Sequence, residues 1–497
     1  MPKHEKTNFE TERGLVEYNV KLYGATGDGT TDDTSVITAV MALAGVNGGV
    51  VFFPVGTYLV TSSIVLKPNV IIQGSGKNNT IIKCPSNMST AIFTKVMSTE
   101  DYLHDTCIRD LTMDGASGAA TRGIVLDSSI NNAIPYYNNF VSNVTFQNFY
   151  IAFYHGANNN GADRMLCDTT VMNCRFQNNA IGYCTRGTYG DWIDHCSFAN
   201  NTVAAIMTPE AISGSGTPAV IGSAPGIGPT TICKVTNIDI NNTGSLPDYT
   251  DGTDYGICMS VSHSTFSNIF ISTVSCLPFA VFTSEPSLDN IFTDIRMYGC
   301  GGGLGLYSCD INSGGIVNGF QIESCGLSTQ FEGDYPGRQM LLNITKGSWK
   351  IAHGKLVNTD NRENIKPAYA VALGDIDDNG LGNVSIEDVT LGTANSGDLT
   401  HLYTTQDSLL LSFRNCPGIN PFGNQAISVP LSTVATATLT CDSTYYITAG
   451  ASACTVVVSG QSSITIPAST MVAVFVPANA TVTPTYTDAP TWVVAGN

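Results

Sequence analysis

The chain has 497 residues, a formal net charge of −18 and only 12% charged residues. This acidic balance argues against nucleic acid, which is bound through a basic surface, and against anionic membranes. No run of 18 apolar residues is present, so the sequence predicts no membrane insertion. The 49 glycines, with abundant asparagine, threonine and serine, are typical of short strands joined by many turns.

Fifteen cysteines occur without a C-x-x-C pair, and the N-terminal stretch MPKHEKTNFETERG lacks the apolar core of a secretory signal. We therefore expect a protein made in a reducing cytoplasm without a signal peptide. Its cysteines should be mostly reduced and buried as small apolar groups.

A loop rich in glycine and aspartate, YGATGDGTTDDTSVITAV at 23–40, follows a short arm of residues 1–17. Gly27-Asp28-Gly29 predicts a tight turn, and Thr31 or Asp32 is expected to cap a helix that ends at Gly45. Phosphate binding is disfavoured because no lysine follows at P-loop spacing. The helix has one apolar stripe, which suits a lid over the open end of a stacked structure: Val36, Ile37, Val40, Met41 and Ala44.

The strand pair GGVVFFPVGTYLV at 48–60 comes next, and residues 18–70 are expected to form an N-terminal cap. Short alternating strands then repeat, and Cys174 and Cys196 fall in the same slot of their repeats. Strand repeats of 20–30 residues predict a β-solenoid. The repeats read NVTFQN (143–148), NCRFQN (173–178), HCSFAN (195–200), NIDINN (237–242), NIFIST (268–273), NIFTDI (290–295), GFQIES (319–324) and NVSIED (383–388).

Alternation within these strands predicts inward columns, because successive side chains of a strand point to opposite faces. One column is Val144, Cys174, Cys196, Ile238, Ile269 and Ile291, and the next is Phe146, Phe176, Phe198, Ile240 and Ile271. At the following turn, stacked asparagines are expected to hydrogen-bond from coil to coil: Asn148, Asn178, Asn200 and Asn242.

A second strand family follows the first, beginning near residues 151, 181, 204, 255, 279, 303 and 369. The sequence therefore predicts an all-β fold, a right-handed single-stranded parallel β-helix with an N-terminal capping helix, over residues 71–425. Residues 426–497 are almost free of charge and alternate with frequent turns. They predict a small C-terminal β-sandwich-like or β-prism domain, for trimerisation or glycan binding.

YGATGDGTTDDT followed by GGVVFFPVGTYLV resembles the start of pectate-lyase-superfamily parallel β-helix proteins, an opening common in bacteriophage tailspikes and polysaccharide depolymerases. The resemblance implies a homotrimer in the virion tail that binds and cleaves a host surface polysaccharide, with another virion tail protein as its attachment partner. Two other activities stay open, a non-catalytic receptor-binding fibre and a polysaccharide lyase, as does a bacterial enzyme that acts alone. Asn358-Thr359-Asp360 matches one polygalacturonase motif, but the others are missing.

An endo-acting glycoside hydrolase needs two carboxylates, and four acids fall in one row where the second strands end: Glu210, Glu285, Asp310 and Asp375. Neighbouring coils lie about 4.8 Å apart, so Glu285 and Asp310 suit a retaining separation and Glu210 and Glu285 an inverting one. The predicted catalytic residues are therefore Glu285 with Glu210 or Asp310. A solvated strand edge is the alternative explanation of the row.

Substrate-binding residues are expected on the outward faces of the first strands and in the turn GTYGDWIDH, where an aromatic ring would stack on a sugar. They are Arg175, Tyr189, Asp191, Trp192, His195 and Asp239, with Asp294, Arg296 and Glu323 as further outward groups. A lyase would instead use Arg164, Arg186, Tyr189 and His195. Trp192 also suits a core or trimer-contact role.

No cofactor is expected. Asp375, Asp377, Asn379 and Gly380 follow the order of a calcium loop, but position twelve is Ile386 rather than glutamate, which favours a plain turn.

Overall fold

The computed structural model describes residues 16–97, 103–128, 135–157, 165–186, 188–208, 230–241, 255–274, 277–283, 288–308, 312–325, 340–344, 347–358, 369–373, 381–393, 400–404, 411–416, 425–427, 437–438, 443–477, 480–488 and 490–496. The chain divides into two compact units, residues 1–285 and 286–497. None of the described helices is long and apolar enough to cross a membrane.

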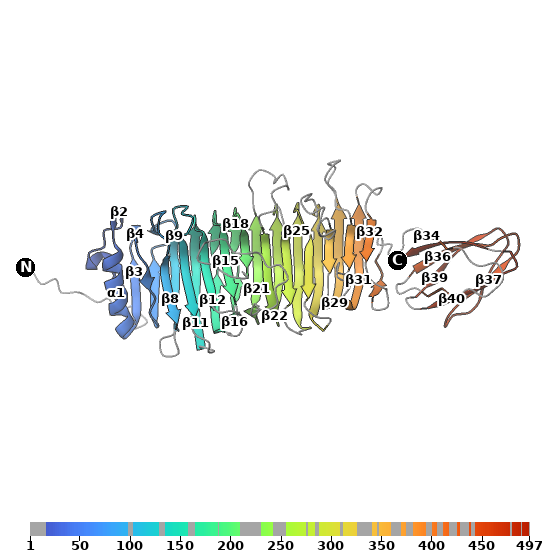
Figure 1. Ribbon diagram of the computed structural model, residues 1–497, viewed down its shortest axis with the longest axis horizontal. Helices are drawn as coiled ribbons and strands as arrows, with labels where there is room; N and C mark the ends of the chain where they lie inside the picture. The colour runs from blue at the N-terminus through green and yellow to red at the C-terminus, as the bar shows by residue number, and fades with distance from the viewer. Residues whose placement is uncertain are drawn as a thin grey trace, which may run out of the picture. The chain divides into compact units, whose positions relative to one another are not determined.

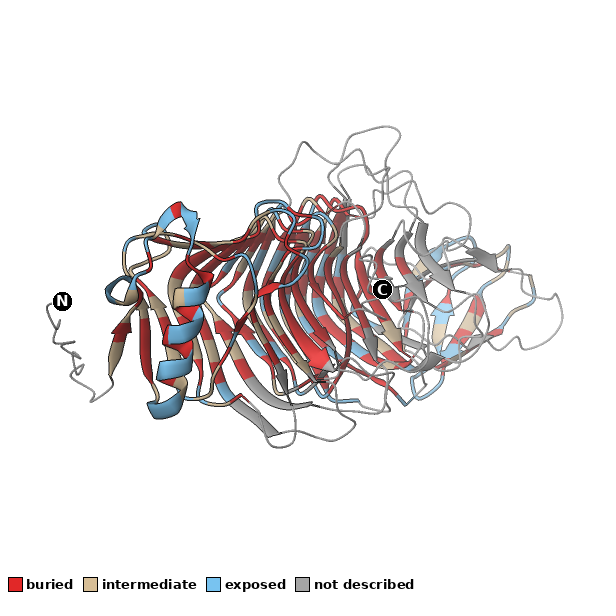
Figure 2. Cartoon of the chain, turned by 60° about the vertical axis from the view of Figure 1, so that its left-hand side comes forward, coloured by how far each residue is buried: buried red, intermediate tan, exposed pale blue. Residues whose placement is uncertain are grey.

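The first unit begins with one α-helix beside stacked strands (Figure 1). Helix α1 contacts β3, β5 and β6. Its inward face is buried while its other side is exposed (Figure 2). The predicted lid over the first coil is therefore present. The elements here are β1 (Glu17–Asn19), η1 (Val20–Tyr23), β2 (Asp28–Asp32), α1 (Thr34–Asn47), β3 (Gly49–Phe53), β4 (Gly56–Leu59), β5 (Ile64–Val65), β6 (Val70–Gly74) and β7 (Thr80–Lys83).

The ends of α1 differ from the sequence prediction. The helix starts at Thr34 and continues past Gly45 to Asn47, where Gly48 supplies the positive φ of 74° that ends it. Asp32 still accepts a hydrogen bond from the Thr34 N–H at 3.0 Å. Asp33 precedes the helix, and its carboxylate turns back to accept from Thr26 N at 2.7 Å and Gly27 N at 3.0 Å. The acidic residues of the opening loop therefore stabilise the conformation of the loop by hydrogen bonds to its own backbone.

Parallel strand ladders form the rest of the first unit. Three sheets result: sheet A runs through β1, β3, β6 and the first halves of the longer strands, sheet B through their second halves, and sheet C through the second strand family. The strands are β8 (Ala91–Met97), β9 (Cys107–Asp114), β10 (Arg122–Ser128), β11 (Pro135–Gln147), β12 (Ile151–Ala157), β13 (Met165–Met172), β14 (Arg175–Gln177), β15 (Ile181–Arg186), β16 (Thr188–Tyr189), β17 (Trp192–Asp194), β18 (Ser197–Ala199), β19 (Ala204–Met207), β20 (Thr230–Thr231), β21 (Lys234–Asn241), β22 (Tyr255–Ser262), β23 (Thr265–Ser272) and β24 (Leu277–Thr283).

The second unit contains two further parallel ladders. β28 pairs with both β26 and β30, so a coil that the sequence analysis missed lies between those two strands. The strands are β25 (Asn290–Tyr298), β26 (Leu304–Ser308), β27 (Gly314–Glu323), β28 (Met340–Ile344), β29 (Gly347–Asn358), β30 (Tyr369–Leu373), β31 (Leu381–Thr393), β32 (Thr400–Thr404) and β33 (Leu411–Arg414).

Each coil bends where one residue adopts a left-handed conformation between sheets A and B. In the first unit these first-corner residues have φ between 48° and 60°: Asp110, Asn143, Asn173, His195, Asn237 and Asn268. A second corner follows five residues later, at Asn148, Asn178, Asn200 and Thr273. Asparagine and aspartate tolerate this conformation better than other non-glycine residues, which explains why they recur at these positions.

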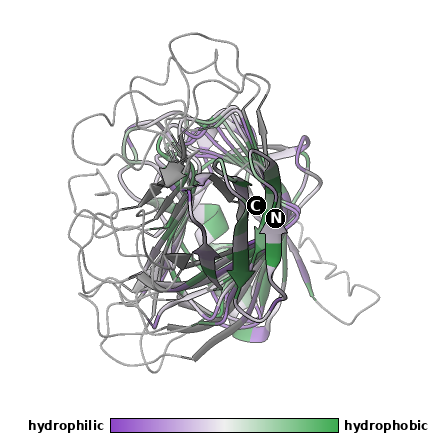
Figure 3. Ribbon diagram, turned by 90° about the vertical axis from the view of Figure 1, so that its right-hand side faces the viewer, coloured by the Kyte–Doolittle hydropathy of each residue, from purple (hydrophilic) through white to green (hydrophobic). Residues whose placement is uncertain are grey.

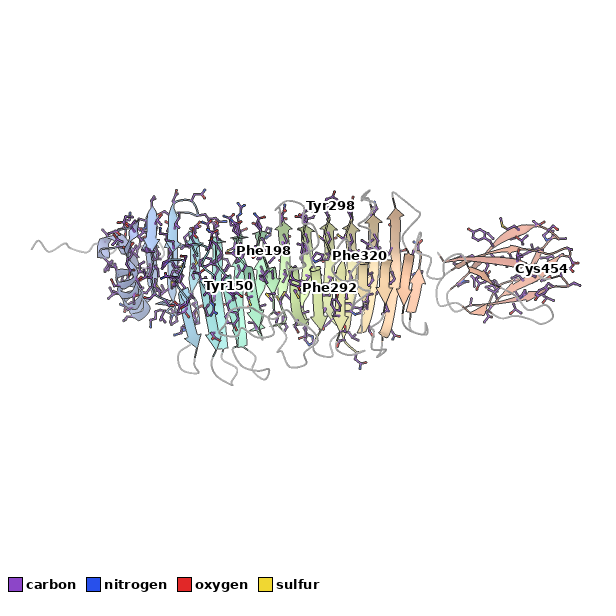
Figure 4. All side chains as sticks on the ribbon, turned by 45° about the horizontal axis from the view of Figure 1, so that its top comes forward. Tyr150, Phe198, Phe292, Tyr298, Phe320 and Cys454 are labelled. Carbon is purple, nitrogen blue, oxygen red and sulfur yellow. The ribbon has the colours of Figure 1, made fainter. Side chains whose placement is uncertain are left out.

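The predicted inward columns are buried, and Phe146, Phe176 and Phe198 stack with ring centroids 4.9 and 4.7 Å apart and planes 5° apart. Figure 3 shows the hydrophobic residues along the strands, and Figure 4 labels Phe198. Ile291 is the exception, because its side chain is 41% exposed. The corner of that coil is Asp294 rather than Asn290, so Ile295 and Met297 occupy the inward positions instead.

The predicted hydrogen bond between asparagines of neighbouring coils is present at Asn178 and Asn200, where Asn200 Nδ2 donates to Asn178 Oδ1 at 3.4 Å, but a second, buried asparagine ladder lies one residue later. Asn178 and Asn200 are exposed at the second corner, whereas Asn179 and Asn201 are buried, and Asn179 Nδ2 donates to Asn201 Oδ1 at 3.0 Å. A left-handed residue breaks the alternation of the strand, so the next side chain turns inward. Asn148 is half-buried, and Asn242 lies outside the described residues.

The C-terminal residues form two four-stranded antiparallel sheets, ordered β34-β41-β36-β39 and β35-β40-β37-β38. Both contribute to one apolar core that includes Tyr445, Val456, Val474 and Val482. The predicted sandwich is therefore present, with Cys454 in its interior (Figure 4). Its strands are β34 (Gln425–Ile427), β35 (Ala437–Thr438), β36 (Ser443–Thr448), β37 (Cys454–Val458), β38 (Ile464–Ile466), β39 (Met471–Val476), β40 (Thr481–Thr485) and β41 (Thr491–Gly496).

Thiol titration of the native protein should find few reactive cysteines. The eleven cysteines whose side chains are described are all free, and all but Cys107 are buried. Burial raises the pKa of Cys84 to about 12 and that of Cys107 to about 11, so little nucleophilic thiolate is present at neutral pH. Most thiols should react only after denaturation. Rapid modification of the majority in native buffer would contradict this expectation.

Candidate functional site

An exposed aromatic platform lies on sheet A beside the first corner. Trp192 is 39% exposed, and the Lys234 ammonium from the next coil sits 5.8 Å from the centroid of its ring. The two residues are register partners on β17 and β21, so the strand pairing places them side by side. Trp192 Nε1 donates to Thr236 Oγ1 at 3.1 Å, which fixes the plane of the indole. An anchored, exposed indole beside a cation can stack on a sugar ring.

A hydrogen-bonded carboxylate supports this platform at the corner. Asp194 Oδ1 accepts from Thr236 Oγ1 at 2.6 Å and from Asn237 Nδ2 at 2.8 Å, while Oδ2 lies 2.8 Å from His195 Nδ1. Burial alone raises the pKa of Asp194, but the three hydrogen bonds and the His195 charge outweigh it and lower the pKa. Asp194 is therefore an anion at neutral pH. It orients the imidazole of His195, whose side chain is 59% exposed.

Arg175 and Asp239 lie on sheet B, on the other side of the corner. Both register with Ser197 of β18, so they sit two strands apart at equivalent outward positions. Both residues are exposed. Desolvation raises the pKa of Asp239.

Asp191, which the sequence placed in the substrate site, is fully buried inside the first unit. Its Oδ2 accepts from Tyr183 Oη at 3.2 Å, Thr185 Oγ1 at 3.1 Å and Thr188 Oγ1 at 2.9 Å. Its Oδ1 lies 3.1 Å from His155 Nδ1. All these side chains are buried, and we call them the His155–Asp191 cluster. Asp191 cannot touch a surface glycan from this position.

Several other predicted residues lie outside what the structure describes. They include the acid row of Glu210, Glu285, Asp310 and Asp375, the calcium-loop residues Asp377 and Asn379, the lyase candidate Arg164, and the side chains of Arg186 and Tyr189. In the part of the chain that is described, no three His, Cys, Asp or Glu side chains are grouped to hold a metal ion.

The further outward groups belong to the second unit. Asp294 is a corner residue with φ 54°, Arg296 is exposed on β25, and Glu323 ends β27. Gln321 Nε2 donates to Glu323 Oε2 at 3.1 Å, so that carboxylate already has a partner on its own strand.

Lys234, Thr236, Asn237 and Asp194 were not predicted from the sequence as site residues. The repeat contained a signal for them. Asn237 is itself a first-corner residue, Thr236 and Lys234 lie one and three residues before it, and Asp194 lies one residue before the corner residue His195. Alignment on the corner residue, rather than on the first asparagine of each strand, brings Trp192 and Lys234 into register. The buried His155 gave no comparable signal, since its strand IAFYHG is apolar on both faces.

The stacked parallel ladders and the capping helix form a parallel β-helix. Residues 18–216 match the family model described as rhamnogalacturonase A/epimerase, pectate lyase-like. Among solved structures, the A-module of mannuronan C-5 epimerase AlgE6 from Azotobacter vinelandii is similar, with a TM-score of 0.53 and 15% sequence identity. The similarity covers 80% of this chain and 98% of that module, and it shows the fold.

Shorter segments are similar to curated proteins. Alginate lyase 7 of A. vinelandii is 38% identical over 109 residues, which is 20% of this chain and 13% of that protein. Mannuronan C5-epimerase AlgE4 is 36% identical over 111 residues, covering 20% of each chain. The preneck appendage protein of Bacillus phage PZA is 40% identical over 65 residues, covering 13% of this chain and 7% of that protein. The matched segments thus span a small part of these relatives.

Proposed function

We propose that this protein binds a host surface polysaccharide and cleaves it, as a tailspike-type component of a phage virion. The observation that carries the binding proposal is the Trp192–Lys234 platform, held by Thr236 and flanked by the anionic Asp194 and the exposed His195. Similarity to a phage appendage protein supports the virion location. Attachment through another tail protein and assembly as a homotrimer remain part of the proposal.

Binding is tested first through Trp192. Trp192→Ala should weaken retention of the protein on an immobilised host polysaccharide about tenfold, because stacking and the cation–π contact are lost together. Tyr298→Ala is the matched control, since Tyr298 is an aromatic residue 51% exposed on the second unit. Affinity electrophoresis against purified capsular and O-antigen polysaccharides measures both variants. Equal retention of Trp192→Ala and the native protein would show that the Trp192–Lys234 platform does not bind the polysaccharide.

For cleavage we propose a glycoside hydrolase with Glu285 and either Glu210 or Asp310 as the carboxylate pair. β19 and β24 both pair with β22, so the strands that precede Glu210 and Glu285 lie two steps apart in one ladder. That separation is about 9–10 Å, which suits an inverting mechanism with a water between the carboxyl groups.

Glu285→Gln should lower turnover by about 10²-fold or more, because a general acid or base contributes that much, while glycan binding persists. Size-exclusion chromatography of polysaccharide products measures turnover. Glu387→Gln, which changes a carboxylate on the second unit that pairs with Arg414 at 3.1 Å, serves as the control and should retain activity. If Glu285→Gln, Glu210→Gln and Asp310→Asn all keep full activity, the acid row is a solvated edge.

A lyase is the second candidate, favoured by the similarity to alginate lyase 7 and by the Asp194–His195 pair. A lyase product carries a carbon–carbon double bond conjugated to a carboxylate and absorbs in the ultraviolet, whereas a hydrolase product does not. Unchanged polymer length with strong binding would instead identify a non-catalytic receptor-binding fibre.

A further inference from the structure

An internal cavity lies among the early coils of the β-helix, behind the start of sheet A. Most of its lining is aliphatic or aromatic, as at Leu66, Ile108 and Phe153. The centre of a water molecule can move within about 10 Å³ of this cavity, which is room for a single water. The cavity is therefore too small for a sugar or another organic ligand.

Three polar side chains also line the cavity, and they come from three successive coils. Thr106 directly precedes β9, Asn139 lies on β11 and Thr169 lies on β13. Asn139 registers with Thr169, and Cys107 registers with Phe140, so the three polar residues occupy equivalent positions of the stack. All three are buried. A polar column thus runs along one side of an apolar cavity.

Thr169 is the member of this column that points to a ligand. Its side chain is fully buried, and no described residue forms a hydrogen bond with Oγ1. Such a hydroxyl is unfavourable, because it has lost its hydrogen bonds to water without replacement. One coil later the column is satisfied by protein groups. Thr170 registers with Trp192, so Asp191 follows Thr169 in the column, and three hydroxyl groups donate to its carboxylate.

The other two polar groups can share a ligand with Thr169. Thr106 Oγ1 donates its proton to Lys67 O at 3.1 Å, and its oxygen can still accept a hydrogen bond. Asn139 Nδ2 donates to Leu103 O at 3.4 Å, and the amide oxygen has two acceptor lone pairs. A molecule that accepts from Thr169 and donates to the other two groups fits this arrangement, and water is the smallest molecule that does so.

We propose that this cavity is a binding site for one structural water that bridges three coils. The water accepts a hydrogen bond from Thr169 Oγ1 and donates to Asn139 Oδ1 and Thr106 Oγ1. It extends the polar interior of the His155–Asp191 cluster by two coils toward the N-terminal cap. The site lies wholly inside the first unit and does not depend on glycan binding.

Thr169→Val tests the water in solution. Valine has nearly the shape of threonine but no hydroxyl, so the bound water loses its donor. The variant should melt about 2–4 °C below the native protein in differential scanning calorimetry.

Thr208→Val is the matched control. Thr208 Oγ1 is equally buried and has no hydrogen-bond partner among the described residues, but Thr208 does not line this cavity. Loss of this hydroxyl should leave the melting temperature unchanged or raise it. A Thr169→Val protein that melts at or above the native temperature, or an equal shift in both variants, would overturn the water site.

Crystals of the full-length protein identify the occupant directly. The expected result is one oxygen peak within hydrogen-bond distance of Thr169 Oγ1 that xenon under pressure does not displace. Xenon density in the cavity of the native protein, or an empty cavity at high resolution, would refute the proposal, because a dry apolar cavity binds xenon.

Discussion

Replacement of Asp191 by alanine should lower the free energy of unfolding of the first unit by about 3–5 kcal/mol. The substitution removes the acceptor shared by Tyr183, Thr185 and Thr188 and leaves the buried His155 without its carboxylate. These groups stay in an apolar interior, where each lost hydrogen bond costs the full desolvation of the polar group. The expected cost is large because four groups depend on one residue.

Urea denaturation followed by tryptophan fluorescence and circular dichroism measures this effect. Asp239→Ala is the control, because it removes an equally acidic but exposed side chain and should change stability by less than about 0.5 kcal/mol. If both variants unfold at the same urea concentration, the His155–Asp191 cluster does not stabilise the coils. Glycan binding is a separate readout, and native-like retention of Asp191→Ala below its unfolding midpoint would agree with its interior position.

Phe176→Ala should destabilise the same unit by about 3–5 kcal/mol. Phe176 is the middle ring of a stack whose outer rings, Phe146 and Phe198, lie 4.9 and 4.7 Å away. All three side chains are buried, and neighbouring coils cannot close the gap because their backbones are hydrogen-bonded at a fixed spacing. A cavity would therefore remain between three coils.

Phe270→Ala is the natural comparison, since Phe270 lies on the outward face of the same sheet and is 43% exposed. It should shift the thermal midpoint far less than Phe176→Ala. Differential scanning calorimetry compares the two directly. Equal shifts would mean that stacking inside the solenoid contributes no more than surface contacts do.

The parallel β-helix could be predicted from the sequence because its repeats place like residues at like positions. Val144, Cys174 and Cys196 share a slot, and burial of all three follows from strand alternation alone. The lid helix was predictable for the same kind of reason, since Ile37, Val40 and Met41 mark one face. Its end was not, because Gly45 has no need to terminate a helix when Gly48 supplies the positive φ at which the helix ends.

The alignment failed where the corner residue changes identity. Asp294 replaces asparagine at the first corner, so the strand that begins at Asn290 was read in the wrong phase and Ile291 was placed inside. Asn178 and Asn200 were predicted at the positions that the buried Asn179 and Asn201 occupy. The reason is related, since strand alternation does not continue through a residue in the left-handed conformation. Strand alternation predicts the face that a side chain occupies only within one extended segment, because a single residue that is not extended changes the alternation after it.

Only part of the candidate site could be predicted. Trp192 was identifiable as a rare aromatic residue in a turn, but its partner Lys234 comes from 42 positions later and becomes visible only through strand register. Asp191 illustrates the opposite error. It follows Gly190, whose φ of 93° marks a turn, and acidic turn residues are usually exposed. Here the buried hydroxyls of Thr185 and Thr188 make the interior the more favourable place for it.

A five-residue step between the two corners recurs in six of the described coils and has an evolutionary consequence. It recurs at 143 and 148, 173 and 178, 195 and 200, and 268 and 273, and in the second unit at 294 and 299 and at 319 and 324. The remaining part of the coil varies in length, from 148 to 173, from 178 to 195 and from 200 to 237. Insertions are therefore tolerated outside the corner segment and excluded within it, where one extra residue would invert every side chain. Such a frame allows the segments outside the corners to change in length without loss of the scaffold.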